Sequence, residues 1–580
     1  MLKRKSWLIG VLILVLTSAS ILAFFYWRPS VTPPTDDNDV WFEDVTDVSG
    51  ITFTHDSGDL NAYWMPRING SGVAVFDFDG DGMLDLYFLS AGDPGSPSVN
   101  RLYKNLGGGN FQDVTAGSGL GIGGRNTGVI VGDVDNDGWP DVVVAQFNGV
   151  KLFRNNGNGT FTDVTTESGL KNPLWATSVN LVDYDRDGWL DLVVVNYVEY
   201  DPSRVCHDQT NRRDYCGPHL FPSTVTKLFH NLGRRAGDAP GQPRFEDVTV
   251  AAGLARTPGP GLGVYCADFN GDGWQDIFIV NDLKANHLWI NQKNGTFLEQ
   301  AIGSGIGLDS MGAALSGMGI AIGDVDNDGM FDVYVTHLTS ERNTLWMQGP
   351  RRGQFRDQTA RAGLLATGWR ATGWGTLMAD FDHDGWQDIA LANGRTNRDS
   401  GNPYPPLGEH FQYYGERNQL FRNDGTGKFR DVSELNPPFC GTPNMGRGLA
   451  AGDLDGDGAL DLVITTIADR ARVFRNVAKN RGHWLIVRAF DPRLNRDAYG
   501  AELLVKAGNR KWLRIVNPGD SFQSSSDPRA HFGLGGESKY DAIQVRWPDG
   551  RSEVFPAGEA DRFVVLRRGE GKEDAPGGPR

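Results

Sequence analysis

Aspartates recur at a fixed spacing in short loops between apolar runs of the sequence. The first loop lies in VFDFDGDGMLDLYF, from Val75 to Phe88, with aspartates at positions 1, 3, 5 and 9 counted from Asp77. Gly82 stands at position 6, where a glycine permits the sharp turn that directs alternate side chains to one centre. Ca²⁺ prefers about six to eight hard oxygen ligands. The spacing therefore predicts a calcium loop, to which the backbone carbonyl of Met83 at position 7 adds a ligand.

The same loop returns in seven copies, most of them at intervals of roughly 50 residues. Only the fourth copy carries an amide, Asn270, and we expect it to bind an ion most weakly because its ligand charge is lower. The predicted ligands are Asp77, Asp79, Asp81 and Asp85; Asp133, Asp135, Asp137 and Asp141; Asp183, Asp185, Asp187 and Asp191; Asp268, Asn270, Asp272 and Asp276; Asp324, Asp326, Asp328 and Asp332; Asp380, Asp382, Asp384 and Asp388; and Asp453, Asp455, Asp457 and Asp461.

Other interpretations of the loops explain the pattern less well. Mg²⁺ demands octahedral geometry and keeps its waters, and Zn²⁺ favours Cys and His ligands, which the loops hardly offer. Asp, Asn and Gly are ordinary turn residues, but turn preference alone does not keep aspartate at positions 1 and 9 in every copy. We therefore predict up to seven structural Ca²⁺ ions, which would offset most of the formal net charge of −16.

A repeated set of strands must position these loops. After each loop comes a strand of the form L-F/Y/W-x-N, such as RLYKN from Arg101, and in six copies a further strand such as FQDVT from Phe111. Four strands in each of seven units predict an all-β fold built on a seven-bladed β-propeller. The last copy lacks its fourth strand, whereas FEDVT stands alone at Phe42, so we predict that Phe42–Thr46 completes the blade of Asp453. A linear solenoid is the alternative, and it would leave this offset unexplained.

The repeats resemble the FG-GAP/VCBS repeat of integrin α-subunit propellers and of exported bacterial proteins, over roughly residues 41–477. That resemblance implies calcium in the loops. Residues 478–568 contain short alternating strands and turns, which predict a small β-sandwich. Within them NRDAYGA from Asn495, HFGLG from His531 and WPDG from Trp547 resemble the ASPIC/UnbV domain. Both parts together are similar to the cartilage acidic protein family, which implies architecture and calcium more than a mechanism.

The N-terminus has the features of a targeting segment. Residues 1–6 are basic, and residues 7–27 form an uncharged run ending in FFYW, which is long enough to cross a bilayer. We predict a cytoplasmic basic segment, one transmembrane signal-anchor helix, a polar linker over residues 28–40, and a bulk that is extracytoplasmic, periplasmic or at the cell surface. A signal peptide cleaved near residues 17–20, giving a secreted protein, is the alternative. Residues 569–580 are predicted to be a disordered tail.

The four cysteines fall into two groups. Cys206 and Cys216 flank a short loop, and in an exported chain they predict a disulfide. The alternative is a metal site in which His207 and His219 join the two thiolates. The remaining two, Cys266 and Cys440, are expected to be small buried residues.

Residues outside the loops offer little evidence of catalysis. The sequence holds no G-x-S-x-G, H-E-x-x-H or Walker motif. His55 is expected to be a hydrogen-bonded loop residue, and His383, at a non-ligand position of the sixth loop, to be exposed. A long non-repeating segment holds Tyr404, Phe411, Tyr413 and Tyr414, which either contact a ligand or only pack the loop.

We therefore expect an exported, membrane-tethered, calcium-binding propeller that acts as a binding, adhesion or scaffold module for an extracellular protein or glycan. An extracytoplasmic enzyme or lectin that acts on polysaccharide through the propeller face or channel is the alternative. The acidic composition argues against nucleic acid as a partner, since phosphate backbones require clustered Lys and Arg.

Overall fold

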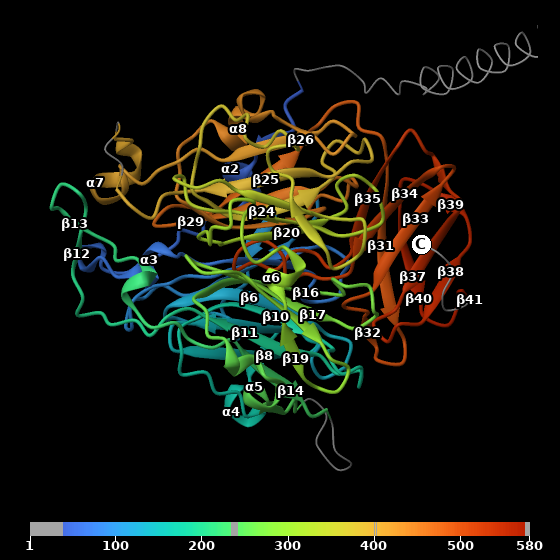
Figure 1. Cartoon of the computed structure of the whole chain (residues 1–580), viewed down its shortest axis with the longest axis horizontal. Coiled ribbons are helices and arrows are strands. Elements are labelled where there is room, and N and C mark those ends of the chain that lie inside the picture. The colour runs from blue at the N-terminus through green and yellow to red at the C-terminus, as the bar shows by residue number, and fades with distance from the viewer. Residues whose placement is uncertain (1–38, 234–241, 399–400, 402, 575–580) are drawn as a thin grey trace, which may run out of the picture. The chain divides into compact units, whose positions relative to one another are not determined.

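The computed structural model describes residues 39–233, 242–398, 401 and 403–574. Within these residues no helix has the length and apolar character of a membrane span. The predicted span at residues 7–27 lies outside the described residues. The described chain is almost entirely strand, turn and loop (Figure 1).

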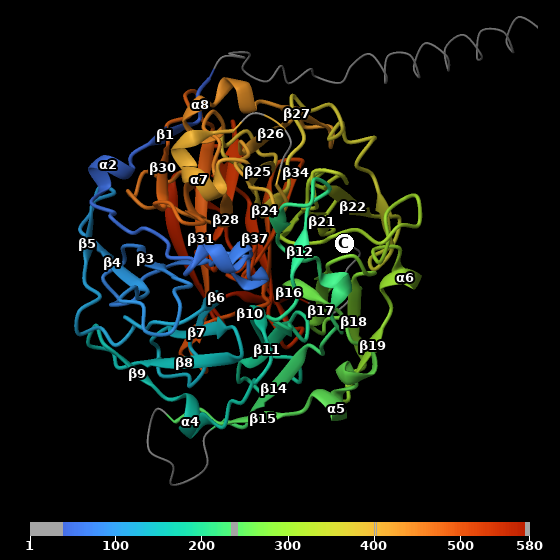
Figure 2. The ribbon, with the colours of Figure 1, turned by 90° about the vertical axis from the view of Figure 1, so that its left-hand side faces the viewer.

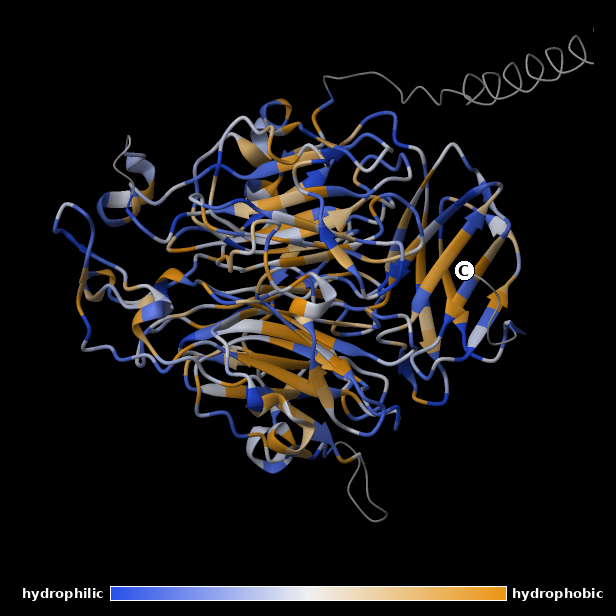
Figure 3. Cartoon of the chain, viewed as in Figure 1, coloured by the Kyte–Doolittle hydropathy of each residue, from blue (hydrophilic) through white to orange (hydrophobic). Residues whose placement is uncertain are grey.

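Seven four-stranded antiparallel sheets, here sheets 1 to 7, make up the repeat region. Strand order follows the chain within each of sheets 1 to 6, and apolar strands alternate with polar loops (Figure 3). The strands are, in sheet 1, β2 (Val73–Phe76), β3 (Asp85–Phe88), β4 (Arg101–Asn105) and β5 (Phe111–Asp113); in sheet 2, β6 (Asn126–Gly132), β7 (Asp141–Gln146), β8 (Gly149–Asn155) and β9 (Phe161–Asp163); in sheet 3, β10 (Ala176–Val182), β11 (Asp191–Asn196), β14 (Lys227–Asn231) and β15 (Phe245–Asp247); in sheet 4, β16 (Gly261–Ala267), β17 (Asp276–Asn281), β18 (His287–Asn291) and β19 (Phe297–Glu299); in sheet 5, β20 (Ile320–Gly323), β21 (Asp332–Val335), β22 (Thr344–Gln348) and β23 (Phe355–Asp357); in sheet 6, β24 (Gly373–Ala379), β25 (Asp388–Asn393), β26 (Gln419–Asn423) and β27 (Phe429–Asp431); and in sheet 7, β28 (Gly446–Gly452), β29 (Asp461–Thr466), β30 (Arg472–Asn476) and β1 (Phe42–Asp44).

The first strands of successive sheets contact one another in chain order, and β28 of sheet 7 contacts β2 of sheet 1. The sheets therefore follow one another around a circle, which Figure 2 shows in rainbow order and which we call the ring. Small residues allow this close approach. At Gly128 in β6, for example, a Cβ atom would lie 2.5 Å from the carbonyl oxygen of Thr177 in the next sheet. The arrangement is consistent with a β-propeller and leaves no place for a linear solenoid.

The N-terminal strand completes the last sheet, as the offset of the repeats predicted. β1 pairs with β30 in the antiparallel register Phe42↔Asn476 and Asp44↔Phe474. Phe42 is fully buried against Phe381 and Phe439. The strand ends two residues earlier than predicted, because Asp44 Oδ1 accepts a hydrogen bond from the Thr46 N–H at 3.0 Å and turns the chain into a helix.

Single helical turns and a small hairpin connect these sheets. The α-helical turns are α2 (Thr46–Ser49), α3 (Met65–Ile68), α4 (Thr165–Ser168), α5 (Thr249–Ala252), α6 (Ala301–Ser304), α7 (Gly408–Phe411) and α8 (Pro437–Cys440). The 3₁₀ turns are Leu60–Ala62, Pro218–Leu220, Leu254–Arg256, Pro405–Leu407 and Ser433–Leu435. The hairpin of β12 (Cys206–His207) and β13 (Arg213–Asp214) belongs to the insertion between β11 and β14.

The C-terminal part forms two further sheets around a core that includes the fully buried Trp512 and Trp547. In one sheet β31 (His483–Asp491) lies between β32 (Arg496–Asp497) and β35 (Ala530–Gly535), and β40 (Arg562–Arg567) runs parallel to it. The other sheet contains β34 (Arg510–Ile515), β33 (Glu502–Ala507), β37 (Ala542–Arg546), β38 (Ser552–Phe555) and β41 (Lys572–Asp574), and β36 (Lys539–Tyr540) pairs separately with β39 (Gly558–Glu559).

One prediction needs correction, and one alternative needs a structural remark. The tail from residue 569 is not wholly disordered, because β41 pairs with β38 and thereby adds an edge strand to the second sheet. The central space of the ring is not open, because residues 517–527 of the C-terminal part hydrogen-bond to the first strands that surround it. The channel named in the enzyme alternative is therefore occupied at this point by a segment of the chain itself.

Candidate metal loops and the face opposite them

In each loop the carboxylate of the first aspartate accepts hydrogen bonds from backbone N–H groups later in the same loop. Asp77 Oδ1 accepts a hydrogen bond from the Gly80 N–H at 2.8 Å, and Asp77 Oδ2 accepts one from the Gly82 N–H at 2.8 Å. The bond from the glycine at position 6 recurs in all seven loops at 2.7–3.1 Å. Gly82 has a φ of 88°, a conformation that favours glycine, which explains why every copy has glycine there.

The ninth-position aspartate begins the second strand and is buried. Asp85 Oδ2 accepts a hydrogen bond from the Phe78 N–H at 3.1 Å, and Asp85 Oδ1 accepts one from the Asn105 N–H at 2.7 Å. Burial, only partly offset by these bonds, raises the pKa of Asp85 to about 8. A buried carboxylate of this kind stays ionised at neutral pH when a cation lies nearby.

In six of the seven sheets an asparagine at the end of the third strand joins neighbouring loops, a role that the sequence analysis missed. Asn105 Nδ2 donates to the carbonyl of Leu84 in its own loop and, at 2.8 Å, to that of Leu454 in the loop of sheet 7. The equivalent asparagines of sheets 2, 3, 4, 6 and 7 donate in the same way to the loop of the preceding sheet. Sheet 5 has Gln348 instead, which donates to Phe331 in its own loop. The signal was present in the L-F/Y/W-x-N landmark, whose asparagine occurs in every copy except that one.

Carboxylate oxygens converge within the loops as predicted for a cation site. Asp77, Asp79 and Asp85 each offer an oxygen within 4.8 Å of the others, and the same holds for the corresponding residues of the second, third and fifth loops. Oδ1 of Asp79 and of Asp382, both at position 3, and Oδ1 of Asp183, at position 1, are buried and lack a hydrogen-bond partner in the described chain. Such oxygens are costly unless they bind a cation. The loop residues all offer oxygen donors and therefore fit Ca²⁺, although at the third loop the ring nitrogen of His230 joins one of the clusters.

Basic side chains from the third strands lie beside several loops. Lys104 Nζ lies 3.0 Å from Asp81 Oδ2, and Arg154 contacts Asp135 and Asp137 at 2.9 and 2.7 Å. Arg422 Nη2 lies 2.7 Å from Asp382 Oδ2 in the sixth loop. These cations reduce the repulsion among the carboxylates, and a bound Ca²⁺ would share the carboxylates with them.

The fourth loop differs from the others. Asn270 Nδ2 donates to Asp272 Oδ2 at 3.1 Å, so this amide already has a partner within the loop. The buried Asp268 Oδ2 lies 2.7 Å from Arg546 Nη1, which comes from β37 of the C-terminal part. A guanidinium thus neutralises the first-position aspartate of this loop, and its residues fit Ca²⁺ less well than those of the other loops.

Two histidines singled out in the sequence lie at buried positions. His55 shares hydrogen bonds with Ser71 Oγ at 3.0 Å and Ser57 Oγ at 3.2 Å, as expected for a structural loop residue. His383 was expected to be exposed, and this is wrong, because only 1% of it is exposed. Its ring packs 5.0 Å from that of His531 in the C-terminal part, a contact that the repeat pattern cannot reveal.

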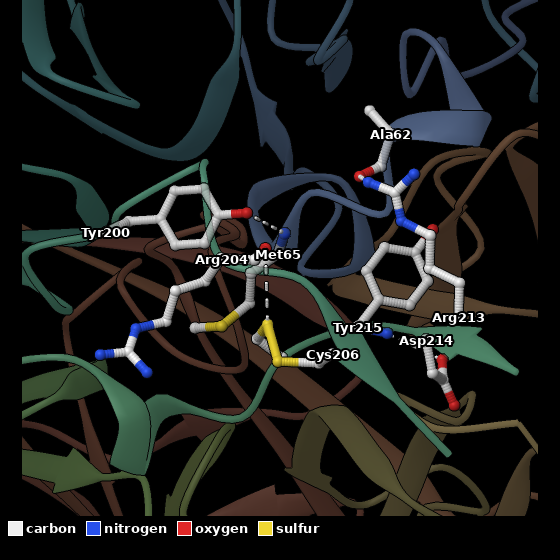
Figure 4. Close-up of a disulfide and its surroundings, with 9 residues drawn as sticks. Ala62, Met65, Tyr200, Arg204, Cys206, Arg213, Asp214 and Tyr215 are labelled. Atoms are coloured by element: carbon white, nitrogen blue, oxygen red, sulfur yellow. Dashed lines mark hydrogen bonds between the residues drawn. A yellow bond between two sulfur atoms is a disulfide. The ribbon is translucent and has the colours of Figure 1, made fainter. Parts of the chain in front are cut away.

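The insertion of sheet 3 lies on the opposite face of the ring from the C-terminal sheets, on the left of Figure 1. Cys206 and Cys216 form a disulfide that closes this hairpin, so their thiolates are not free to join His207 and His219 as metal ligands. Arg213 Nη2 donates to the carbonyl of Ala62 at 3.0 Å, which connects the hairpin to the 3₁₀ turn Leu60–Ala62 that precedes sheet 1 (Figure 4).

The aromatic segment packs against this hairpin. Phe411 and Tyr414 are buried, and Tyr414 OH donates to Asp214 Oδ1 at 2.6 Å. These two residues therefore pack the loop, which is the second of the two alternatives given for this segment. Tyr404 and Tyr413 are half-buried and remain available at the surface.

A cavity of about 750 Å³ lies between the hairpin, α3 and residues 396–398. Tyr197 OH donates to Asp282 in its wall, and burial raises the pKa of Asp282 to about 6. Asn69 also lines the cavity, is buried, and has an Nδ2 without a partner in the described chain. The cavity thus offers acceptors and an unused donor beside the aromatic ring of Trp374.

These features of loop and fold are matched by known families. The FG-GAP-like repeat model matches residues 77–144, 133–194, 268–335, 324–391 and 411–464, about half of the chain, and the ASPIC and UnbV model matches residues 491–573. The chain belongs to the family of FG-GAP-like repeat proteins.

Curated proteins of two vertebrates are similar to part of the chain. Cartilage acidic protein 1 of Xenopus tropicalis is 29% identical over 363 residues, covering 60% of this chain and 50% of that protein. The Homo sapiens protein is 28% identical over 334 residues, covering 56% of this chain and 46% of that protein. The chain thus spans about half the length of the curated relatives it matches.

Solved structures align only weakly with the chain. A lectin of Agrocybe aegerita, described for its recognition of non-reducing terminal N-acetylglucosamine, aligns with a TM-score of 0.38 and 16% identity over 71% of this chain and 94% of the lectin. Rhamnogalacturonan lyase YesW aligns with a TM-score of 0.30 and 12% identity over 86% of this chain and 90% of that structure.

Proposed function

We propose that the ring is a seven-bladed, calcium-binding β-propeller that acts outside the cytoplasm as a binding module. The converging carboxylates and their buried, unpaired oxygens support calcium in the loops. The uncharged run at residues 7–27 supports a membrane anchor, and the disulfide supports an oxidising compartment.

The cavity beside the disulfide hairpin is the observation that carries the binding function. It has the volume range of small-ligand pockets, and its wall combines the Asp282 carboxylate, the Asn69 amide and aromatic rings. A hydroxyl-bearing ligand, such as a sugar unit of an extracellular glycan, matches this mixture of donors and acceptors. An extracellular protein that inserts a polar side chain is the other occupant that we propose.

A glycan array and an extracellular-protein pull-down, both run with the calcium-loaded chain, test this proposal. We expect one of them to yield a ligand, and the variant Asp282→Asn to lose at least tenfold in affinity because it loses the acceptor charge. Glu559→Gln, a change at an exposed residue of the C-terminal part, is the matched control and should bind like the parent chain. No retained ligand, or an Asp282→Asn variant that binds normally, would refute the cavity as the site.

A further inference from the structure

The C-terminal motifs have no part in the function proposed above. NRDAYGA, HFGLG and the residues around WPDG lie in different strands and loops of the C-terminal part. All three nevertheless contact the ring at or beside its aspartate loops. Their partners are mainly backbone carbonyls and side chains of those loops.

The first motif contacts the loops of sheets 2 and 3. Arg496 is buried, and its Nε donates to Asn136 Oδ1 at 2.8 Å while its Nη2 donates to the Gly188 carbonyl at 3.2 Å. Tyr499 OH donates to the carbonyl of Val131 in β6 at 3.1 Å. A guanidinium has several donors in a fixed fork, which suits it to bridging two loops in this way.

The second motif contacts the loops of sheets 6 and 7. His531 Nε2 lies 2.9 Å from the Gly458 carbonyl, and the Gly535 N–H donates to the His383 carbonyl at 2.9 Å. Gly533 lies so close to the sixth loop that a Cβ atom would stand 1.9 Å from Asp380 Oδ2. Glycine at this position is therefore required by the contact with the ring and not by a backbone conformation of its own.

The neighbourhood of the third motif contacts sheets 4, 5 and 6. Arg546, which directly precedes WPDG, pairs with Asp268 of the fourth loop. On the same sheet, Lys511 Nζ donates to the Asp328 carbonyl at 2.5 Å and Trp512 Nε1 donates to the Gly385 carbonyl at 2.9 Å. Six of the seven loops thus have a direct bond to the C-terminal part.

The segment between the motifs, residues 517–527, occupies the centre of the ring. The Ser525 N–H donates to Val73 at 2.9 Å, and the Ser521 N–H donates to Ile320 at 2.7 Å. Its other partners on the first strands, by sheet, are Val75 (sheet 1), Val129 and Val131 (sheet 2), Asn180 (sheet 3), Cys266 (sheet 4), Thr376 (sheet 6) and Ala451 (sheet 7). One short segment therefore contacts a first strand of every sheet.

We propose that the C-terminal domain is an internal lock for the ring, with the aspartate loops as its binding partner. Its motifs hold the loops from outside, and residues 517–527 hold the seven first strands from within. The partner surface recognised by these motifs is thus the chain itself, an acidic surface lined by carbonyls. The inference rests on hydrogen bonds between protein atoms and stands whether or not the cavity binds a ligand.

Glycine substitutions in the full chain test the lock without removing a polar group. Gly533→Ala places a methyl group against Asp380, and Gly72→Ala places one 1.7 Å from the Gln523 carbonyl. Gly536→Ala is the matched control, because nothing lies within 4 Å of its added Cβ atom. We expect the first two variants to unfold at a lower midpoint, or in two separate transitions, both in calcium and in chelator. If they unfold like Gly536→Ala, the lock is refuted.

Amide hydrogen exchange, measured on the unmodified chain, is a second test that does not depend on whether a variant folds. The amides of Ser521 and Ser525 should exchange as slowly as those of the first strands, because both donate into them. Exchange at the rate of an exposed loop would overturn the proposal.

Discussion

At the scale of single residues, the repeated loop pattern gives two kinds of loop. In one kind the carboxylates fit a Ca²⁺ ion, and in the other an arginine side chain pairs with the first aspartate. In the fifth loop Asp324 and Asp332 belong to a cluster of converging carboxylates. In the fourth loop Asn270 bonds within the loop and Arg546 pairs with Asp268. A buried carboxylate needs one compensating cation, and in the fourth loop a protein side chain already supplies it.

Counting bound calcium by equilibrium dialysis tests this difference. Asp324→Asn should reduce the number of tightly bound ions by one, because it removes a charged ligand from a loop that fits Ca²⁺. Asp268→Asn should leave the number unchanged. A loss of one ion in both variants would show that Arg546 does not take the place of calcium.

At the scale of elements, the ring is closed by an exchange of strands between its two ends. β1 comes from the N-terminal end of the described chain and pairs with β30, so sheet 7 contains both ends of the repeat region. Phe42 anchors this pairing, since its ring packs 5.4 Å from that of Phe381 and 5.8 Å from that of Phe439.

Phe42→Ala should therefore destabilise the chain by about 3–5 kcal/mol, the usual cost of removing a buried phenylalanine ring. Urea unfolding followed by tryptophan fluorescence measures this loss. Val48→Ala, at a residue of α2 that is 76% exposed, is the control and should change stability by less than about 0.5 kcal/mol. Equal effects of the two changes would contradict the anchoring role of Phe42.

Strands, loops and ring closure could be predicted because their signals are local and repeated. The alternation of apolar and polar residues, the Asp-Gly loops and the displaced FEDVT each lie within a few residues of the chain. The lock could not be predicted in this way. Residues 517–527 read NPGDSFQSSSD, a polar turn-rich composition that normally indicates an exposed loop. Their burial, like that of His383, depends on partners hundreds of residues away.

At the scale of the whole molecule, many acidic loops share one rigid frame. The loops of six sheet junctions are linked by asparagine bonds, and six loops also contact the C-terminal domain. A cation bound in one loop is therefore expected to stabilise the neighbouring loops as well. Its removal should lower the stability of the whole ring.

Thermal unfolding of the full chain in excess calcium, magnesium or chelator tests this expectation. Calcium should raise the midpoint strongly, since each ion adds about 2.7 kcal/mol when its concentration is 100 times its Kd. Magnesium should have little effect. Equal midpoints in calcium and chelator would mean that the aspartates act only as turn residues.

The pairing of β1 with β30 also sets the order in which the chain can fold. Glu43 and Arg475 form an ion pair across this junction although they lie 432 residues apart in sequence. Within the described ring, β1 is synthesised before every other strand, and its partner β30 is synthesised after every other strand. Until sheet 7 is made, β1 has an unpaired edge, and residues 517–527 reach the centre later still. The ring can therefore be completed only after sheet 7 and residues 517–527 have been synthesised, and unpaired strand edges stay at risk of aggregation until then.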